Sequence, residues 1–120
     1  HEMPKKIFER ELELLKDIQG CEELILRNKL LEKEINDTVQ NAIIKTKDKE
    51  DNEVEKHAFT NAGSRQAEAN RLMNQNSIYT ETRDKIKKMK SEMKVKEISI
   101  SFLKRNFRAA ESITRLEGVM

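Results

Sequence analysis

A seven-residue spacing of mostly apolar side chains dominates the second half of this 120-residue chain. The series comprises Tyr79, Ile86, Met93, Ile100, Phe107 and Thr114. A companion series, offset by three residues, comprises Thr82, Met89, Lys96, Leu103 and Ala110. Because seven residues are close to two helical turns, both series face one side of a single helix, as in a coiled coil. The pattern therefore predicts a long helix that pairs with another helix.

The first half carries its own helical stripe, with apolar residues mostly at steps of three, four and seven. The stripe comprises Ile7, Leu14, Ile18, Cys21, Ile25, Leu31, Ile35, Val39 and Ala42. It predicts a helix over residues 4–44, which begins at a proline whose missing N–H costs nothing in a first turn. Gly20 is its weak point, because an interior glycine costs about 1 kcal/mol relative to alanine. Either the helix continues through Gly20, or residues 4–19 form a short third helix.

Residues 45–60 separate the two helical patterns and are highly charged. Up to His57, Val54 is the one apolar side chain of this stretch, so it has no apolar stripe. We expect a solvated polar tip here, followed by a long helix over residues 61–117. Side-chain oxygens can cap the first turn of that helix by accepting a backbone N–H. The candidate caps are Thr60, Asn61 and Ser64.

Two long helices joined by a short tip predict an all-α fold, an elongated, coiled-coil-like antiparallel helical hairpin in a single domain over residues 1–120. A thin hairpin buries little surface per residue, so we expect a homo-oligomer. A second apolar face points the same way, because one partner helix cannot cover two faces of the second-half helix. We expect this face to bind a partner, and it comprises Val95, Ile98, Phe102, Ala109 and Ile113.

Composition excludes several classes of protein. Hydrophobic residues make up 36% of the chain and aromatic residues 4%, which argues against a catalytic domain with a deep apolar pocket. No apolar run approaches the ~20 residues that span a bilayer, so we expect no membrane contact. The chain shows no export signal and has one cysteine, which predicts the reducing cytoplasm of a bacterial host cell.

Charge is unevenly divided along the chain. Residues 1–60 hold 11 basic and 15 acidic side chains, whereas residues 61–120 hold 13 and 7. The basic excess forms a stripe that can neutralise phosphates, which would make the chain a nucleic-acid-binding protein. Alternatively, the acidic first helix lies alongside the stripe and neutralises it. The candidate phosphate-binding residues are Arg83, Lys85, Lys87, Lys88, Lys90, Lys94, Arg105 and Arg108.

Motifs that would carry catalysis or a cofactor are weak. Two carboxylate pairs have the spacing found in all-helical, Mg²⁺-dependent nucleotide pyrophosphohydrolases, but a chain this acidic contains such pairs by chance. They are Glu50 with Glu53, and Glu81 with Asp84. Neither His57 nor Cys21 belongs to a set of three or four metal ligands or to a catalytic constellation. We therefore predict no catalytic residue, no metal and no cofactor.

Two asparagines fall on the helical stripes, Asn28 and Asn76. A polar residue at a coiled-coil seam can fix register and partner number. We expect both residues to lie in the seam, where they are points at which to test specificity.

The segment over residues 57–111 resembles small, charged helical-hairpin proteins of unknown function that bacteriophages and prophages encode. The resembling residues begin with His57-Ala58-Phe59-Thr60-Asn61-Ala62 and end with Phe102-Leu103-Lys104-Arg105-Asn106-Phe107-Arg108. Between them lie Arg65-Gln66-Ala67-Glu68, Arg71-Leu72 and Tyr79. The resemblance implies an antiparallel hairpin and carries no catalytic residues.

These observations favour a non-enzymatic interaction or scaffolding protein of a phage or mobile element, which acts through an exposed helix face. An accessory nucleic-acid-binding protein of phage replication or recombination is the first alternative. A further alternative is an inhibitor of a host enzyme or defence system.

Overall fold

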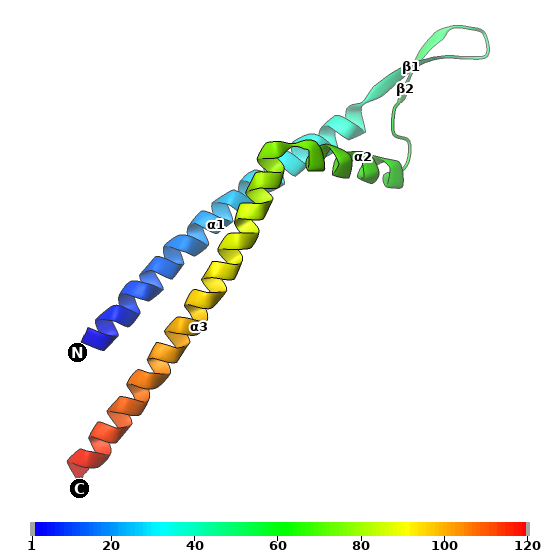
Figure 1. The fold of residues 1–120 in the computed structure, drawn as a ribbon. Coiled ribbons are helices and arrows are strands. Elements are labelled where there is room, and N and C mark those ends of the chain that lie inside the picture. Colours follow the sequence, from blue (N-terminus) through cyan, green and yellow to red (C-terminus); the bar gives the residue numbers. More distant parts are fainter. Residues whose placement is uncertain (1, 120) are drawn as a thin grey trace. The chain divides into compact units, whose positions relative to one another are not determined.

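The computed structural model describes residues 2–119, which form three helices and one β-hairpin (Figure 1). The elements in chain order are α1 (Glu2–Asn41), β1 (Ile43–Lys47), β2 (Glu53–His57), α2 (Ala62–Gln75) and α3 (Ser77–Val119). The chain divides into two compact units. Unit 1 contains the chain up to Glu23 and from Lys85 onward, and unit 2 contains Leu24–Asp84. Each unit is described by itself.

Helix α1 continues through Gly20, so the separate third helix over residues 4–19 is not formed. A Cβ atom placed on Gly20 would lie 3.8 Å from Met89 Cε, an ordinary contact distance. There is therefore room for a side chain at this position, and no close approach of α3 requires a glycine there.

The predicted stripe is confirmed as far as Val39, because each of these residues is buried or half-buried, with Cys21 and Val39 only 2% exposed. The predicted helix over residues 4–44 is too long at its end, since α1 ends at Asn41 and the β-branched Ile43 and Ile44 enter strand β1.

In unit 1, α1 and α3 pack as an antiparallel pair along the predicted seven-residue series. Ile100 at the centre of the α3 seam is 6% exposed, and Ile7 on α1 is 9% exposed. Lys104 pairs with Glu11 near one end of the seam, and Lys96 pairs with Asp17 further along. These pairs show that residue numbers rise on one helix as they fall on the other. The prediction of an antiparallel helical hairpin is confirmed.

The seven-residue series loses its partner at its carboxy-terminal end. The seam residues from Tyr79 to Phe107 are buried or half-buried, whereas Ala110 and Thr114 are exposed. They lie six and ten residues beyond Lys104, the α3 residue that pairs with Glu11 near the start of α1. The pairing of α1 with α3 therefore ends before α3 does.

Unit 2 contains a small apolar cluster between α1 and α2. Val39, Ala69 and Met73 form its buried centre, and partly buried side chains pack around them. Ala69 is completely buried. Its short side chain allows α1 and α2 to pack closely at this point. The surrounding side chains are Ile35, Phe59, Leu72 and Tyr79.

The predicted polar tip over residues 45–60 is in fact mostly a β-hairpin. Strands β1 and β2 are antiparallel and bring Lys45 opposite Glu55 and Lys47 opposite Glu53. Opposite charges that face each other across two strands stabilise their pairing. The tip is solvated as expected, since most of its side chains are exposed, but its backbone is ordered by the strand ladder.

Asp48 organises the turn that joins the two strands. Its Oδ1 atom accepts hydrogen bonds from the backbone N–H groups of Glu50, at 2.9 Å, and Asn52, at 2.8 Å. Asp51 adopts a left-handed conformation with φ of 63°, a region that aspartate tolerates better than most residues. The turn is therefore built by local hydrogen bonds from a side chain that favours turns.

Asn61 caps α2, as one of the three predicted candidates. Its Oδ1 accepts the backbone N–H of Ser64 at 2.7 Å, while the Ser64 hydroxyl bonds back to the Asn61 backbone N–H. This reciprocal pair is a capping box.

The predicted continuous helix over residues 61–117 is divided at Asn76. The backbone there is extended, with φ of −82° and ψ of 109°, and the chain changes direction between α2 and α3 (Figure 1). The Asn76 side chain accepts the backbone N–H of Tyr79 at 3.0 Å. Asn76 therefore caps the start of α3 and does not lie in a seam. The predicted long helix is interrupted here because asparagine favours a capping position over a helix interior.

Candidate interaction surface

The second apolar face of α3 is exposed in unit 1, as a surface for a partner requires. We call the predicted residues Val95, Ile98, Phe102, Ala109 and Ile113 the α3 stripe. Val95 is 66% exposed, Ile98 63%, Phe102 60% and Ile113 57%, and Ala109 is also exposed. Isolated exposed leucines are common on protein surfaces, whereas a row of large apolar side chains marks an interaction site.

Helix geometry explains why α1 leaves this stripe uncovered. At 3.6 residues per turn, Ile98 and Phe102 lie close to the opposite side of α3 from Met93 and Ile100. Ile100 packs toward α1 and is 6% exposed, although Ile98 is only two positions away. The stripe continues to Leu116, which is 65% exposed and was not among the predicted residues. Helix α3 is therefore apolar on two faces and packed on one.

Helix α1 carries a second exposed stripe that the sequence analysis did not identify. Phe8 is 65% exposed, Leu12 43% and Leu15 61%, and we call these three residues the α1 stripe. Their spacing of four and then three residues places them on one side of the helix, away from Ile7 and Leu14 in the seam. The same periodicity that predicted the buried stripe could have revealed this one.

The charged residues between α1 and α3 are paired in only a few places. Lys96 lies in the seam and pairs with two α1 carboxylates, that of Asp17 and that of Glu13, the latter at 3.2 Å. These hydrogen bonds, first to Asp17 and then to Glu13, raise the pKa of the Lys96 ammonium above its usual value. Lys104 pairs with Glu11. The acidic first helix therefore neutralises these two lysines.

Most of the predicted phosphate-binding residues remain unpaired. Arg83 bonds Asp84 Oδ1 at 3.4 Å and Asn74 Oδ1 at 3.5 Å. Among the described side chains, those of residues 4–118, the other candidates form no ion pair and are exposed. They are Lys85, Lys87, Lys88, Lys90, Lys94, Arg105 and Arg108. Among the described side chains, the first helix does not neutralise the whole basic stripe, which was one of the two alternatives.

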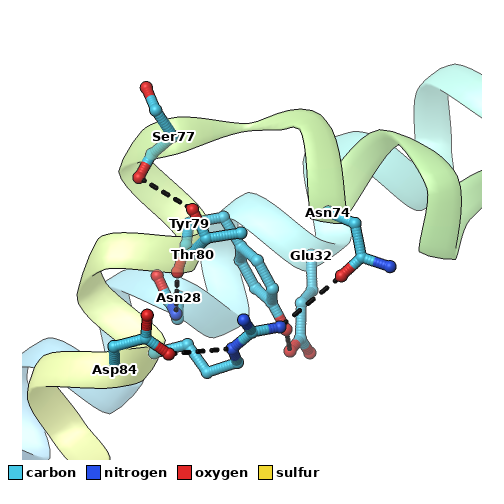
Figure 2. Close-up of polar contacts among 8 residues, drawn as sticks. Asn28, Glu32, Asn74, Ser77, Tyr79, Thr80 and Asp84 are labelled. Atoms are coloured by element: carbon cyan, nitrogen blue, oxygen red, sulfur yellow. Dashed lines mark hydrogen bonds and ion pairs between the residues drawn. The ribbon is translucent and has the colours of Figure 1, made fainter.

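A polar cluster crosses the helix pair in unit 2 (Figure 2). The Tyr79 hydroxyl donates a hydrogen bond of 2.7 Å to Glu32 Oε1 on α1, and Asn28 Nδ2 donates to the Tyr79 carbonyl at 3.1 Å. The bond to the Glu32 carboxylate, with some burial, raises the pKa of the Tyr79 phenol. Asn28 is 7% exposed and its Oδ1 has no hydrogen-bond partner. The seam position predicted for Asn28 is therefore confirmed.

The residues considered for catalysis or metal binding lie on several elements of the described part of the chain. Residues 2–119 contain no group of three or more histidine, cysteine, aspartate or glutamate side chains that could hold a metal ion. Glu50 lies in the hairpin turn and Glu53 on β2, whereas Glu81 and Asp84 are on α3. Cys21 is buried in the seam as a free thiol. Among the described residues, no helix is both long and apolar enough to cross a membrane.

Comparisons with known proteins return nothing similar: no family model, no curated protein and no solved structure matches the chain. The functional argument therefore rests on the residues themselves.

Proposed function

We propose that this protein is a non-enzymatic interaction or scaffolding protein that acts through the α3 stripe. The observation that carries the proposal is the exposure of Val95, Ile98 and Phe102, each at least 60% accessible, on a helix whose opposite side already packs in a seam. Because residues 57–111 resemble phage-encoded hairpin proteins, we further propose a role in a phage or mobile element, in the cytoplasm of a bacterial host.

Energetics support a partner for this surface. Fully burying a valine, isoleucine or phenylalanine side chain contributes about 1.5–3 kcal/mol. More than half of each of these side chains remains exposed in the single chain, so much of that contribution is still available to a partner. Helix-face recognition commonly uses anchors at spacings of three, four and seven residues, which is the spacing of the stripe.

The test is the molar mass of the protein in solution, measured by size-exclusion chromatography with light scattering. Phe102→Glu places a charge in the middle of the stripe, and we expect it to reduce the mass to that of one chain. Ser101→Glu is the matched control, because it introduces the same charge at the neighbouring exposed position outside the stripe. A mass that is unchanged in Phe102→Glu would show that the stripe is not the working surface.

Nucleic-acid binding is a second proposal, and the unpaired cations of α3 favour it. Replacing Lys85, Lys87 and Lys88 together by alanine should weaken binding to every oligonucleotide and flatten its dependence on salt. Fluorescence anisotropy with labelled single-stranded and duplex DNA, at low and physiological salt, measures both effects. The absence of binding at low salt would exclude this function.

A further inference from the structure

The α1 stripe is exposed in unit 1 and needs a partner to bury it. Phe8 and Leu15 are as exposed as the central residues of the α3 stripe, and within unit 1 neither stripe faces the other helix. Two uncovered apolar rows on one molecule can be covered by two different partners, or by each other in neighbouring copies. The intervals between the side chains distinguish these cases.

The two stripes have matching intervals when the helices run in opposite directions. The α1 stripe has steps of four and then three residues, from Phe8 to Leu15, whereas Val95, Ile98 and Phe102 have steps of three and then four. At 1.5 Å per residue, each row covers about 10 Å of its helix. In an antiparallel approach, Phe8 would lie opposite Phe102, and Leu15 opposite Val95. This is the direction in which α1 and α3 already pair within the chain.

Charge favours the same pairing over its alternatives. Residues 4–23 contain four basic and six acidic side chains, for a net charge of −2. Residues 85–118 contain ten basic and four acidic side chains, for a net charge of +6. Two copies that met through α3 on both sides would bring like charges together, which is unfavourable. An approach of α1 to α3 brings a negative helix to a positive one.

We propose that the α3 stripe of one copy binds the α1 stripe of a second copy of this chain. The inference rests on the proposed function and names the partner. Because the two contacting surfaces differ, one such contact leaves one further stripe on each copy. Those two stripes either bind each other in a closed two-fold dimer, or bind further copies in a larger ring or an open filament.

Two single variants and their mixture test the proposal. Leu15→Glu removes the α1 stripe and leaves the α3 stripe intact, whereas Phe102→Glu does the reverse. Each variant alone should be monomeric, because it lacks one of the two surfaces. Mixed in equal amounts, they should form a complex of one copy of each and nothing larger, since the intact α3 stripe of Leu15→Glu can bind the intact α1 stripe of Phe102→Glu.

Sedimentation velocity of each variant and of the mixture measures these masses. Ile78→Glu is the control, because it places the same charge at an exposed apolar side chain of unit 2, 65% accessible, on a side of α3 away from the stripe. It should associate as the wild type does. Circular dichroism should show the same helix content in all variants, since the substituted side chains lie on the surface.

Each contrary outcome has a separate meaning. If Leu15→Glu associates as the wild type does while Phe102→Glu is monomeric, the α1 stripe is not the partner and the inference fails, although the proposed function stands. Two monomeric variants whose mixture stays monomeric would also overturn the inference. A wild type that is monomeric at every concentration would overturn both, and its binding to DNA or to vesicles of anionic lipid would then identify another occupant.

Discussion

Units 1 and 2 use the same two helices in different ways. In unit 1, α1 and α3 meet along a narrow seam and leave an apolar stripe exposed on each helix. In unit 2, a third helix covers α1, and Val39, Ala69 and Met73 form a closed cluster. Exposed apolar side chains also remain in unit 2, at Leu26, Leu30, Ile43, Ile44 and Ile78, but there α2 adds a buried centre. The comparison teaches that a seam between two helices buries one face of each and leaves the second apolar face of each helix in unit 1 for a partner.

The largest expected effects come from truncating one buried side chain in each unit. Ile100→Ala in unit 1 and Met73→Ala in unit 2 each remove a side chain that is less than 10% exposed, so each should lower the free energy of unfolding by about 2–4 kcal/mol. Urea denaturation followed by circular dichroism measures the loss. A loss below about 1 kcal/mol for Ile100→Ala would contradict the seam assigned to unit 1.

Tyr79→Phe should have the next largest effect, and it sharpens the description of unit 2. The variant loses the hydrogen bond to Glu32, which should cost about 1 kcal/mol near neutral pH. Because the folded protein holds the pKa of Tyr79 above its usual value of 10.0, this contribution is present below about pH 10 and is lost as pH rises through the raised pKa. The difference in unfolding free energy between wild type and variant should therefore shrink in alkaline solution. A difference that is constant with pH would contradict the bond to Glu32.

Asp51→Gly should have a smaller effect of the opposite sign. Glycine adopts the left-handed conformation of this turn more readily than aspartate, so the hairpin should gain about 0.5 kcal/mol. The ion pair of Asp51 with Lys47, at 3.6 Å between two exposed side chains, contributes little that would be lost. Hydrogen exchange of the backbone amides in β1 and β2 should slow in Asp51→Gly and accelerate in Asp51→Ala. Faster exchange in the glycine variant would contradict the φ assigned to Asp51.

Lys96→Met should change stability least, and it tests whether the unit 1 seam needs its charges. Methionine suits a helix seam, and its burial offsets the loss of the ion pairs to Glu13 and Asp17. Because these partners raise the pKa of Lys96, the contribution of the lysine is present below its usual value of 10.5 and is lost as pH rises further. The variant should melt at or above the wild-type temperature and depend less on salt. A clear drop in melting temperature would show that the seam depends on the lysine.

Periodicity alone predicted the seam between α1 and α3, but not the packing of α2 on α1 in unit 2. The series from Tyr79 to Phe107 is buried or half-buried along its whole length, because a helix that packs on another helix must repeat its apolar side in step with its turns. The same reasoning predicted the exposed α3 stripe as a surface apart from the seam. Helix pattern is a local property, so one sequence suffices to find it.

The parts that sequence analysis missed depend on partners or on competing local preferences. The alternation of charged and β-branched residues in Lys45-Thr46-Lys47 and Glu53-Val54-Glu55 is typical of strands, but the segment was judged by its lack of a helical stripe. An asparagine such as Asn76 can lie in a seam or cap a helix. The change of chain direction at this residue, which distinguishes the two, is not visible in the sequence. The register of α1 against α3 determines which lysines form ion pairs with carboxylates. The spacing of residues along the sequence does not determine that register.

In our proposal, the exposed stripes of unit 1 are the surfaces through which the protein assembles. Hydrogen–deuterium exchange of the wild type at low and high protein concentration tests this claim most directly, because it locates the contact as well as detecting it. We predict slower exchange at high concentration in the backbone around Leu12 and around Ile98, with no change in β1 and β2. Exchange that is independent of concentration around Ile98, or that slows only elsewhere in the chain, would contradict the claim.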